Sequence, residues 1–240
     1  LDIDGFAAAD AALNGLQVDN GGAEVRKIAF AVDACLETFT RAAAGGARLL
    51  FVHHGLFWGN QERVTGVYHR RLAFLLEHQL ALYAAHLPLD QHPLAGNNAA
   101  LAQKLGLRNI EPFGIYHGRK IGYKGALSPE LGIHEAARLI SHNGQPPAAL
   151  LPFGVPRNRS CAIISGGAAR EALQAIDEEI DLYVTGEASH EIYHFALEGK
   201  LNMLCGGHYA TEVWGVQKMR ELCAAALPVE TEFIDVPTGL

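Results

Sequence analysis

Strand-like apolar runs alternate with helical stretches along the chain, and this alternation restricts the fold more than any other feature. Residues 25–34 form an apolar run, a helical stretch then closes at Gly45 and Gly46, and residues 47–52 form a second run. Another helical stretch, with regularly spaced leucines, leads into a third run at 80–85. Alternating strands and helices favour an α/β fold with a mostly parallel sheet.

A second set of elements is expected beyond a boundary near residue 112. We interpret residues 111–118 as a connector, residues 120–127 as a strand and Ser128-Pro129 as a helix start, because proline is favoured at the first helical position. Four later segments have strand character and four have helical character. The strands are expected at 160–165, 181–185, 201–204 and 229–236, and the helices at 129–143, 168–178, 189–198 and 211–226.

Composition excludes several classes of protein. The 240 residues are 49% hydrophobic and 19% charged, which is typical of a globular protein with a sizeable core. The formal charge of −7 argues against a broad basic surface for DNA, and no apolar run approaches the length of a membrane helix. The four cysteines form no C-x-x-C pair and nothing resembles a signal peptide, so we expect a cytoplasmic protein.

The twelve histidines are the most informative residues for function. Neutral imidazole is the commonest nitrogen ligand for transition metals. His53 and His54 follow the run at 47–52 and precede Gly55, which allows a sharp turn. Open α/β sheets bind ligands at the carboxyl ends of their strands, so these imidazoles are candidate metal ligands. The structural alternative is that one caps a carbonyl and the other is solvated.

Asp90 follows the run at 80–85 through the segment His86-Leu-Pro-Leu. Because Pro88 opposes a helix, we expect this segment to be extended and to present Asp90 as an oxygen ligand. The alternative is a turn aspartate ahead of the helix that starts at Asn97 or Asn98.

His208 and Glu212 follow the strand expected at 201–204. They stand four residues apart at a helix start, where both side chains can point to one spot. The alternative is a helix start capped by Thr211, with Glu212 favoured there by the helix dipole. Three nitrogens and two carboxylates would thus gather at one sheet edge. This donor set suits Zn²⁺, Fe²⁺ or Mn²⁺, and it is rich enough to hold two ions if a carboxylate bridges them.

Three further patterns bear on chemistry. Glu187 follows the strand expected at 181–185 and is a candidate general acid or base, or else a helix-start carboxylate. Gly166-Gly167 joins a strand to a helix and could offer backbone N–H groups to an anion. His190-Glu191-Ile-Tyr-His194 has the zinc-peptidase pattern H-E-x-x-H, but Leu197 replaces the glycine of the extended signature. A zinc peptidase is therefore a minor alternative.

The chain resembles the NIF-three-like dinuclear-metal-centre family, known in bacteria as type 2 GTP cyclohydrolase I homologues, and particularly its short YbgI-type members. The shared segments run through the chain in the family's order, and they are Asn14-Gly-Leu-Gln-Val18, His53-His54-Gly-Leu-Phe-Trp58, His86-Leu-Pro-Leu-Asp90, Gly96-Asn-Asn98, Thr185-Gly-Glu187 and Gly207-His-Tyr-Ala-Thr-Glu212. The resemblance implies two α/β domains with mainly parallel central sheets. We place the metal-binding domain at 1–112 plus 206–240, completed by the C-terminal segment, and the second domain at 113–205.

The resemblance also implies a ligand set and an assembly. It implies His54 and Asp90 on one metal ion, His53 and His208 on the other, and Glu212 bridging both. His86 would be an auxiliary ligand or a proton shuttle. The implied assembly is a toroidal homohexamer.

Our leading hypothesis is a metal-dependent hydrolase that acts on an anionic, nucleotide-like substrate, with Glu187 or His86 moving protons. For a GTP-type substrate the step would be hydrolytic opening of the purine imidazole ring. The alternative is a non-enzymatic, metal-dependent ring that binds a protein or nucleic-acid partner.

Overall fold

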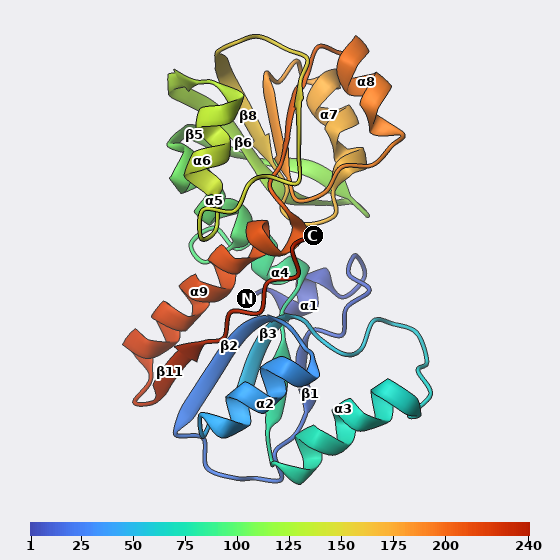
Figure 1. Ribbon diagram of the computed structural model, residues 1–240, viewed down its shortest axis with the longest axis vertical. Helices are drawn as coiled ribbons and strands as arrows, with labels where there is room; N and C mark the ends of the chain where they lie inside the picture. The colour runs from blue at the N-terminus through green and yellow to red at the C-terminus, as the bar shows by residue number, and fades with distance from the viewer. The chain divides into compact units, whose positions relative to one another are not determined.

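The computed structural model describes all 240 residues, and the chain divides into two compact units (Figure 1). Unit 1 contains residues 1–89 and 216–236, and unit 2 contains residues 90–215 and 237–240. Each unit has its own β-sheet with helices packed on it, so the expected pair of α/β domains is confirmed. No helix combines the length and the apolar character that crossing a bilayer requires.

Unit 1 is built on a five-stranded sheet in the order β1-β4-β3-β2-β11. Only β1 is antiparallel to its neighbour. The strands are β1 (Gly15–Val18), β2 (Lys27–Asp33), β3 (Leu49–His54), β4 (Ala81–Ala84) and β11 (Glu230–Phe233). Because β11 pairs with β2, the C-terminal part of the chain completes this sheet as expected.

Two helices cover one face of this sheet (Figure 1). They are α2 (Leu36–Ala44) and α3 (Gly66–Glu77), and the short α1 (Ile3–Phe6) lies near the N-terminus. Phe39 of α2 and Leu75 of α3 pack with Leu50 of β3 in one buried cluster. The central strands β2 and β3 are buried at nearly every position, on both faces of the sheet, which accounts for their continuous apolar sequence.

Unit 2 contains a six-stranded sheet in the order β5-β6-β8-β9-β10-β7. Strands β8, β9 and β10 are parallel, whereas β5, β6 and β7 join them in antiparallel pairs. Its parallel part is therefore confined to the centre. The strands are β5 (Leu107–Tyr116), β6 (Arg119–Leu131), β7 (Ala149–Pro152), β8 (Asn158–Ile163), β9 (Leu182–Thr185) and β10 (Asn202–Cys205).

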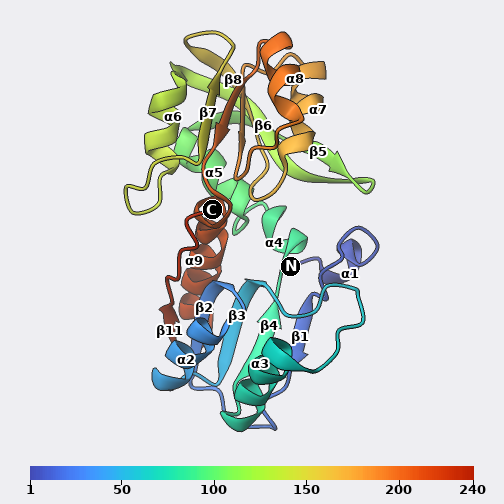
Figure 2. The same cartoon turned by 45° about the vertical axis from the view of Figure 1, so that its right-hand side comes forward.

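Helices cover both faces of the unit 2 sheet, with α5 and α6 on one face and α7 and α8 on the other (Figure 2). The bounds are α5 (Asn97–Leu105), α6 (Ile133–Ile140), η1 (Ala169–Glu171), α7 (Ala172–Asp177) and α8 (Ile192–Glu198). The long helix α9 (His208–Ala226) begins in unit 2 and ends in unit 1. Helix α5 ends at Gly106, whose φ of 69° is the left-handed conformation that glycine adopts without strain.

The region around residue 112 differs from the expectation. Most of the expected connector at 111–118 belongs to β5, which pairs antiparallel with β6. Pro112 is tolerated there because β5 is an edge strand, where a missing N–H costs no sheet hydrogen bond. The expected domain boundary therefore falls inside a strand, and the compact unit starts at Asp90 instead.

Two proline segments also differ. Ser128-Pro129 lies within β6, and the following helix starts only at Ile133. Pairing of Leu131 with Asn158 of β8 keeps this segment in the sheet. Pro88 lies inside the one-turn helix α4 (Leu87–Asp90), not in an extended segment, because the first turn of a helix does not need the missing N–H.

Replacing Leu50 by alanine tests the core of unit 1. Leu50 is fully buried, so Leu50→Ala should lower the free energy of unfolding by about 2–5 kcal/mol. Leu76→Ala is the matched control because Leu76 is 63% exposed, and it should change stability by less than about 0.5 kcal/mol. Urea denaturation measures both. Equal losses in the two variants would contradict the assigned core.

Candidate metal centre

His53 and His54 occupy the carboxyl end of β3, as the sequence predicted. The His53 ring is fully buried, and its Nδ1 lies 2.9 Å from the carbonyl oxygen of Ala85. The His54 Nδ1 lies 2.8 Å from Oδ1 of Asp33, at the end of β2. Carbonyl and carboxylate oxygens only accept hydrogen bonds, so each Nδ1 carries the proton and each Nε2 carries the lone pair.

His86 follows β4 and is held by Asp10. Its Nδ1 lies 2.8 Å from Asp10 Oδ1, and its backbone N–H donates to Asn14 Oδ1. Burial would raise the pKa of the Asp10 carboxyl, but the hydrogen bond and charge of His86, with donors from Asn14 and Ala12, outweigh burial and lower that pKa. Asp10 is therefore a carboxylate that fixes the orientation of the His86 ring through Nδ1.

The three imidazoles of unit 1 form a cluster. One ligand nitrogen from each of His53, His54 and His86 lies within 4.8 Å of the other two. The centroid of the His53 ring is 4.6 Å from that of His54 and 5.0 Å from that of His86. Trp58 borders the cluster, with its ring centroid 5.0 Å from that of His86. Three imidazoles at this spacing, once each Nε2 is unprotonated, are a donor set for Zn²⁺, Fe²⁺ or Mn²⁺.

In unit 2, Asp90 is buried and held from two elements. Its Oδ1 accepts hydrogen bonds from Asn97 Nδ2 at 2.9 Å and from Ser165 Oγ at 3.0 Å. Asn97 also accepts a hydrogen bond from the N–H of Gly215 in α9. These two side-chain donors fix the orientation of the Asp90 carboxylate.

His208 and Glu212 lie four residues apart at the start of α9. His208 Nε2 lies 3.3 Å from Glu212 Oε2, so the four-residue spacing does bring them to one spot. Glu187 follows β9, and its Oε1 lies 2.5 Å from His208 Nδ1. Glu187 therefore contacts the His208 ring at Nδ1, opposite the Nε2 atom that lies near Glu212. The Glu212 side chain is almost fully buried.

The loop after β8 fits tightly against these side chains. A Cβ on Gly166 would lie 2.2 Å from Glu212 Oε1, and the residue has a φ of +67°. The Gly166 N–H donates to Thr211 Oγ1 at 3.0 Å. This N–H is already used within the protein, so Gly166 acts here as a spacer beside Glu212, not as the anion cradle that we considered.

The H-E-x-x-H segment does not form a helix-borne pair. His190 and Glu191 precede α8, which starts at Ile192, and the side chains of His190, Glu191 and His194 are exposed. Glu191 instead lies 3.8 Å from the guanidinium of Arg170. The structure gives the zinc-peptidase alternative no support.

Sequence reasoning missed the residues that hold the candidate ligands. These are Asp10, Asp33 and Ser165, with Asn97 known only as a helix start and as part of a shared segment. Asp33 had a usable signal, because it stands at the carboxyl end of a strand adjacent to that of His54. Asp10 had none, because it lies 76 residues from His86.

Comparison with known proteins gives consistent matches over nearly the whole chain. A family model described as Duf34/NIF3 (NGG1p interacting factor 3) matches residues 4–238. A relative from Archaeoglobus fulgidus is 45% identical over 231 residues, covering 96% of this chain and 92% of the relative. One from Treponema pallidum is 41% identical, covering 100% and 96%. Both are named GTP cyclohydrolase 1 type 2 homolog.

Solved structures agree with these matches. A protein from Thermus thermophilus, TTHA1606, is 35% identical with a TM-score of 0.84, over 99% of this chain and 94% of that one. The protein ybgI, described as of unknown function, is 32% identical with a TM-score of 0.90, over 99% and 95%.

Asp33→Ala tests the orientation of His54. Without the carboxylate, the His54 ring loses the partner that fixes its tautomer, so metal affinity should fall about 10–100-fold. Asp4→Ala, at an exposed position of unit 1, should leave affinity unchanged. Titration with Zn²⁺ against a competing chelator measures both variants. Unchanged affinity in Asp33→Ala would contradict the role of this carboxylate.

Gly166→Ala tests the packing around Glu212. Gly118→Ala is the control, because both variants place a Cβ at positive φ, which lowers stability by about 1 kcal/mol. Only at Gly166 would the added Cβ clash with another side chain, that of Glu212. Gly166→Ala should therefore displace the Glu212 carboxylate and lower metal content, whereas Gly118→Ala should lower stability alone. Elemental analysis and thermal unfolding distinguish them. Equal metal content in the two folded variants would refute this packing argument.

Proposed function

The chain belongs to the Duf34/NIF3 family, and we propose that it is a metal-dependent hydrolase acting on an anionic, nucleotide-like substrate. In this proposal two divalent ions are held by His53, His54, Asp90, His208 and Glu212. His54 and Asp90 hold one ion, His53 and His208 hold the other, and Glu212 bridges them.

The donor chemistry of the two units supports this proposal. The observation that carries it is the fixed tautomer of the unit 1 imidazoles, since a ligand nitrogen must be unprotonated to bind a metal. Unit 2 supplies two buried carboxylates, Asp90 and Glu212. Buried carboxylates are costly unless they are paired or bind a cation. Imidazole with carboxylate suits Zn²⁺, Fe²⁺ or Mn²⁺, so the residues fit the proposed ions.

Charge favours an anionic substrate. The two divalent cations carry more charge than the two carboxylates proposed to bind them, Asp90 and Glu212, so an anionic group of a substrate can coordinate the ions although the whole chain carries a formal charge of −7. The name of the relatives, GTP cyclohydrolase 1 type 2 homolog, points to a nucleotide as the substrate to test first. For such a substrate the reaction is hydrolytic opening of the purine imidazole ring.

The residues around the ligands would orient groups and move protons. Bound divalent ions supply Lewis acidity and make water a stronger nucleophile near neutral pH. Asp10 holds the Nδ1 proton of His86, so His86 would exchange a proton at Nε2. Glu187 would hold or accept the Nδ1 proton of His208. Ser165 would keep Asp90 in one orientation.

The toroidal homohexamer implied by the family resemblance is part of the proposal. Light scattering coupled to size-exclusion chromatography tests it. A mass of six chains of 25.8 kDa would support it, and a monomer at micromolar concentration would contradict it.

Metal analysis with a nucleotide panel tests the function itself. Wild type should bind about two ions per chain, and Glu212→Ala should fall toward one or none because the bridging carboxylate is lost. The Asp90→Asn variant should fold as wild type does, but its rate of GTP hydrolysis should fall at least about 100-fold. His190→Ala with His194→Ala is the control.

The control double variant should keep both metal and activity. Loss of metal in the control, with retention in His53→Ala, would replace the proposal with a zinc peptidase. Full metal occupancy without turnover of any nucleotide would favour the non-enzymatic metal-dependent ring.

A further inference from the structure

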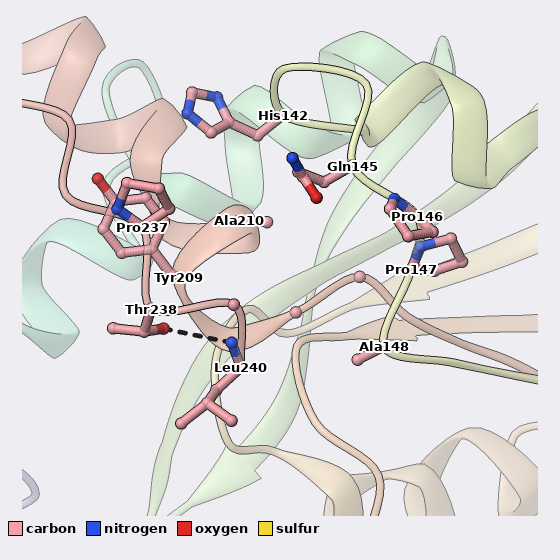
Figure 3. A pocket seen from close by; sticks show the side chains of 13 residues that line it. His142, Gln145, Pro146, Pro147, Ala148, Tyr209, Ala210, Pro237, Thr238 and Leu240 are labelled. Atoms are coloured by element: carbon pink, nitrogen blue, oxygen red, sulfur yellow. Dashed lines mark hydrogen bonds between the residues drawn. The ribbon is translucent and has the colours of Figure 1, made fainter.

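Unit 2 contains a cavity of about 420 Å³ that none of the proposed metal ligands lines. Three segments form it: the loop after α6, the start of α9, and residues 237–240. Figure 3 shows Tyr209 and Pro237 on one side, Pro146 and Pro147 on the other, and the Ala210 methyl group between them. Cavities that bind small molecules have volumes in this range.

The side chains of the lining disfavour charged ligand groups. No Asp, Glu, Lys or Arg lines the cavity, so a buried charge would lose its hydration without gaining an ionic partner. The lining instead offers apolar ring carbons, from the largely buried rings of Tyr209 and His142 and from three prolines. The centroids of the His142 and Tyr209 rings are 6.3 Å apart. These surfaces suit a neutral, planar ring system.

The polar groups that line the cavity indicate which type of ligand ring would bind there. Figure 3 shows the side-chain amide of Gln145 at the cavity. A primary amide has a donor and an acceptor side by side, and this pattern matches the hydrogen-bonding edge of a purine. Aromatic faces stack on any base, whereas an amide adds a directional contact.

We propose that this cavity binds the purine base of the nucleotide substrate. The inference rests on the proposed function for the choice of a nucleotide. The same segment that lines the cavity with Gly207 and Tyr209 carries the candidate ligand His208 between them. The cavity would thus hold the uncharged base beside the turn that carries this ligand, as a reaction at the purine ring requires.

Guanosine is the probe because it has the base without phosphate charge. Full-length protein as purified should bind guanosine in isothermal titration, and ribose 5-phosphate should not compete. Ala210→Phe should fill the cavity and raise the dissociation constant at least about tenfold. Gln145→Ala should raise it about threefold to tenfold. Ala225→Phe, at an exposed position of the same helix, should bind as wild type.

The outcomes separate this inference from the proposed function. Ala210→Phe with wild-type thermal unfolding and wild-type guanosine affinity would overturn the base site, as would absence of guanosine binding at millimolar concentration. Displacement of guanosine by ribose 5-phosphate would also overturn it. Failure of the metal-loaded protein to hydrolyse nucleotides would end the proposed function, yet guanosine binding lost in Ala210→Phe would still support the cavity.

Discussion

The imidazole rings of His53, His54 and His86 are oriented by hydrogen bonds that their Nδ1 atoms donate. Ala85 O, Asp33 and Asp10 each accept one such bond, from His53, His54 and His86 respectively. A neutral imidazole has one protonated nitrogen, so these three acceptors would place the lone pair of each neutral ring on Nε2. Without them the rings would rotate and exchange tautomers, and a cluster of three nitrogens within 4.8 Å would not be a defined donor set.

The parallel strands of the two sheets explain why the polar side chains lie at the carboxyl ends of the strands. Parallel strands end side by side, so residues that follow β2, β3 and β4 lie together in unit 1. The same rule applies in unit 2, where the loops after β8, β9 and β10 supply Ser165, Glu187 and His208. Each unit therefore presents its polar side chains at the carboxyl ends of otherwise apolar strands.

Two glycines allow polar side chains to approach the backbone closely next to the candidate ligands. Gly166 leaves room for Glu212, and Gly55 leaves room for Gln17, whose side chain accepts the N–H of Leu56 after the histidine pair. A Cβ at Gly55 would lie 2.4 Å from Gln17 Nε2. In both units a glycine lets a polar side chain contact the backbone beside a candidate ligand, which limits the freedom of the loop that carries it.

Local sequence determined most of the strands, most helices and the candidate ligands at strand ends, but not β1, β5 or β7, because apolar periodicity acts over short separations. Tertiary structure decided the rest. Asp10 reaches His86 across 76 residues, and no local pattern reports such a pairing. Residues 111–116 became a strand because β6 was available to pair with them, and an edge position accepts Pro112. The unit boundary at Asp90 likewise reflects packing, which depends on contacts between residues far apart in the chain.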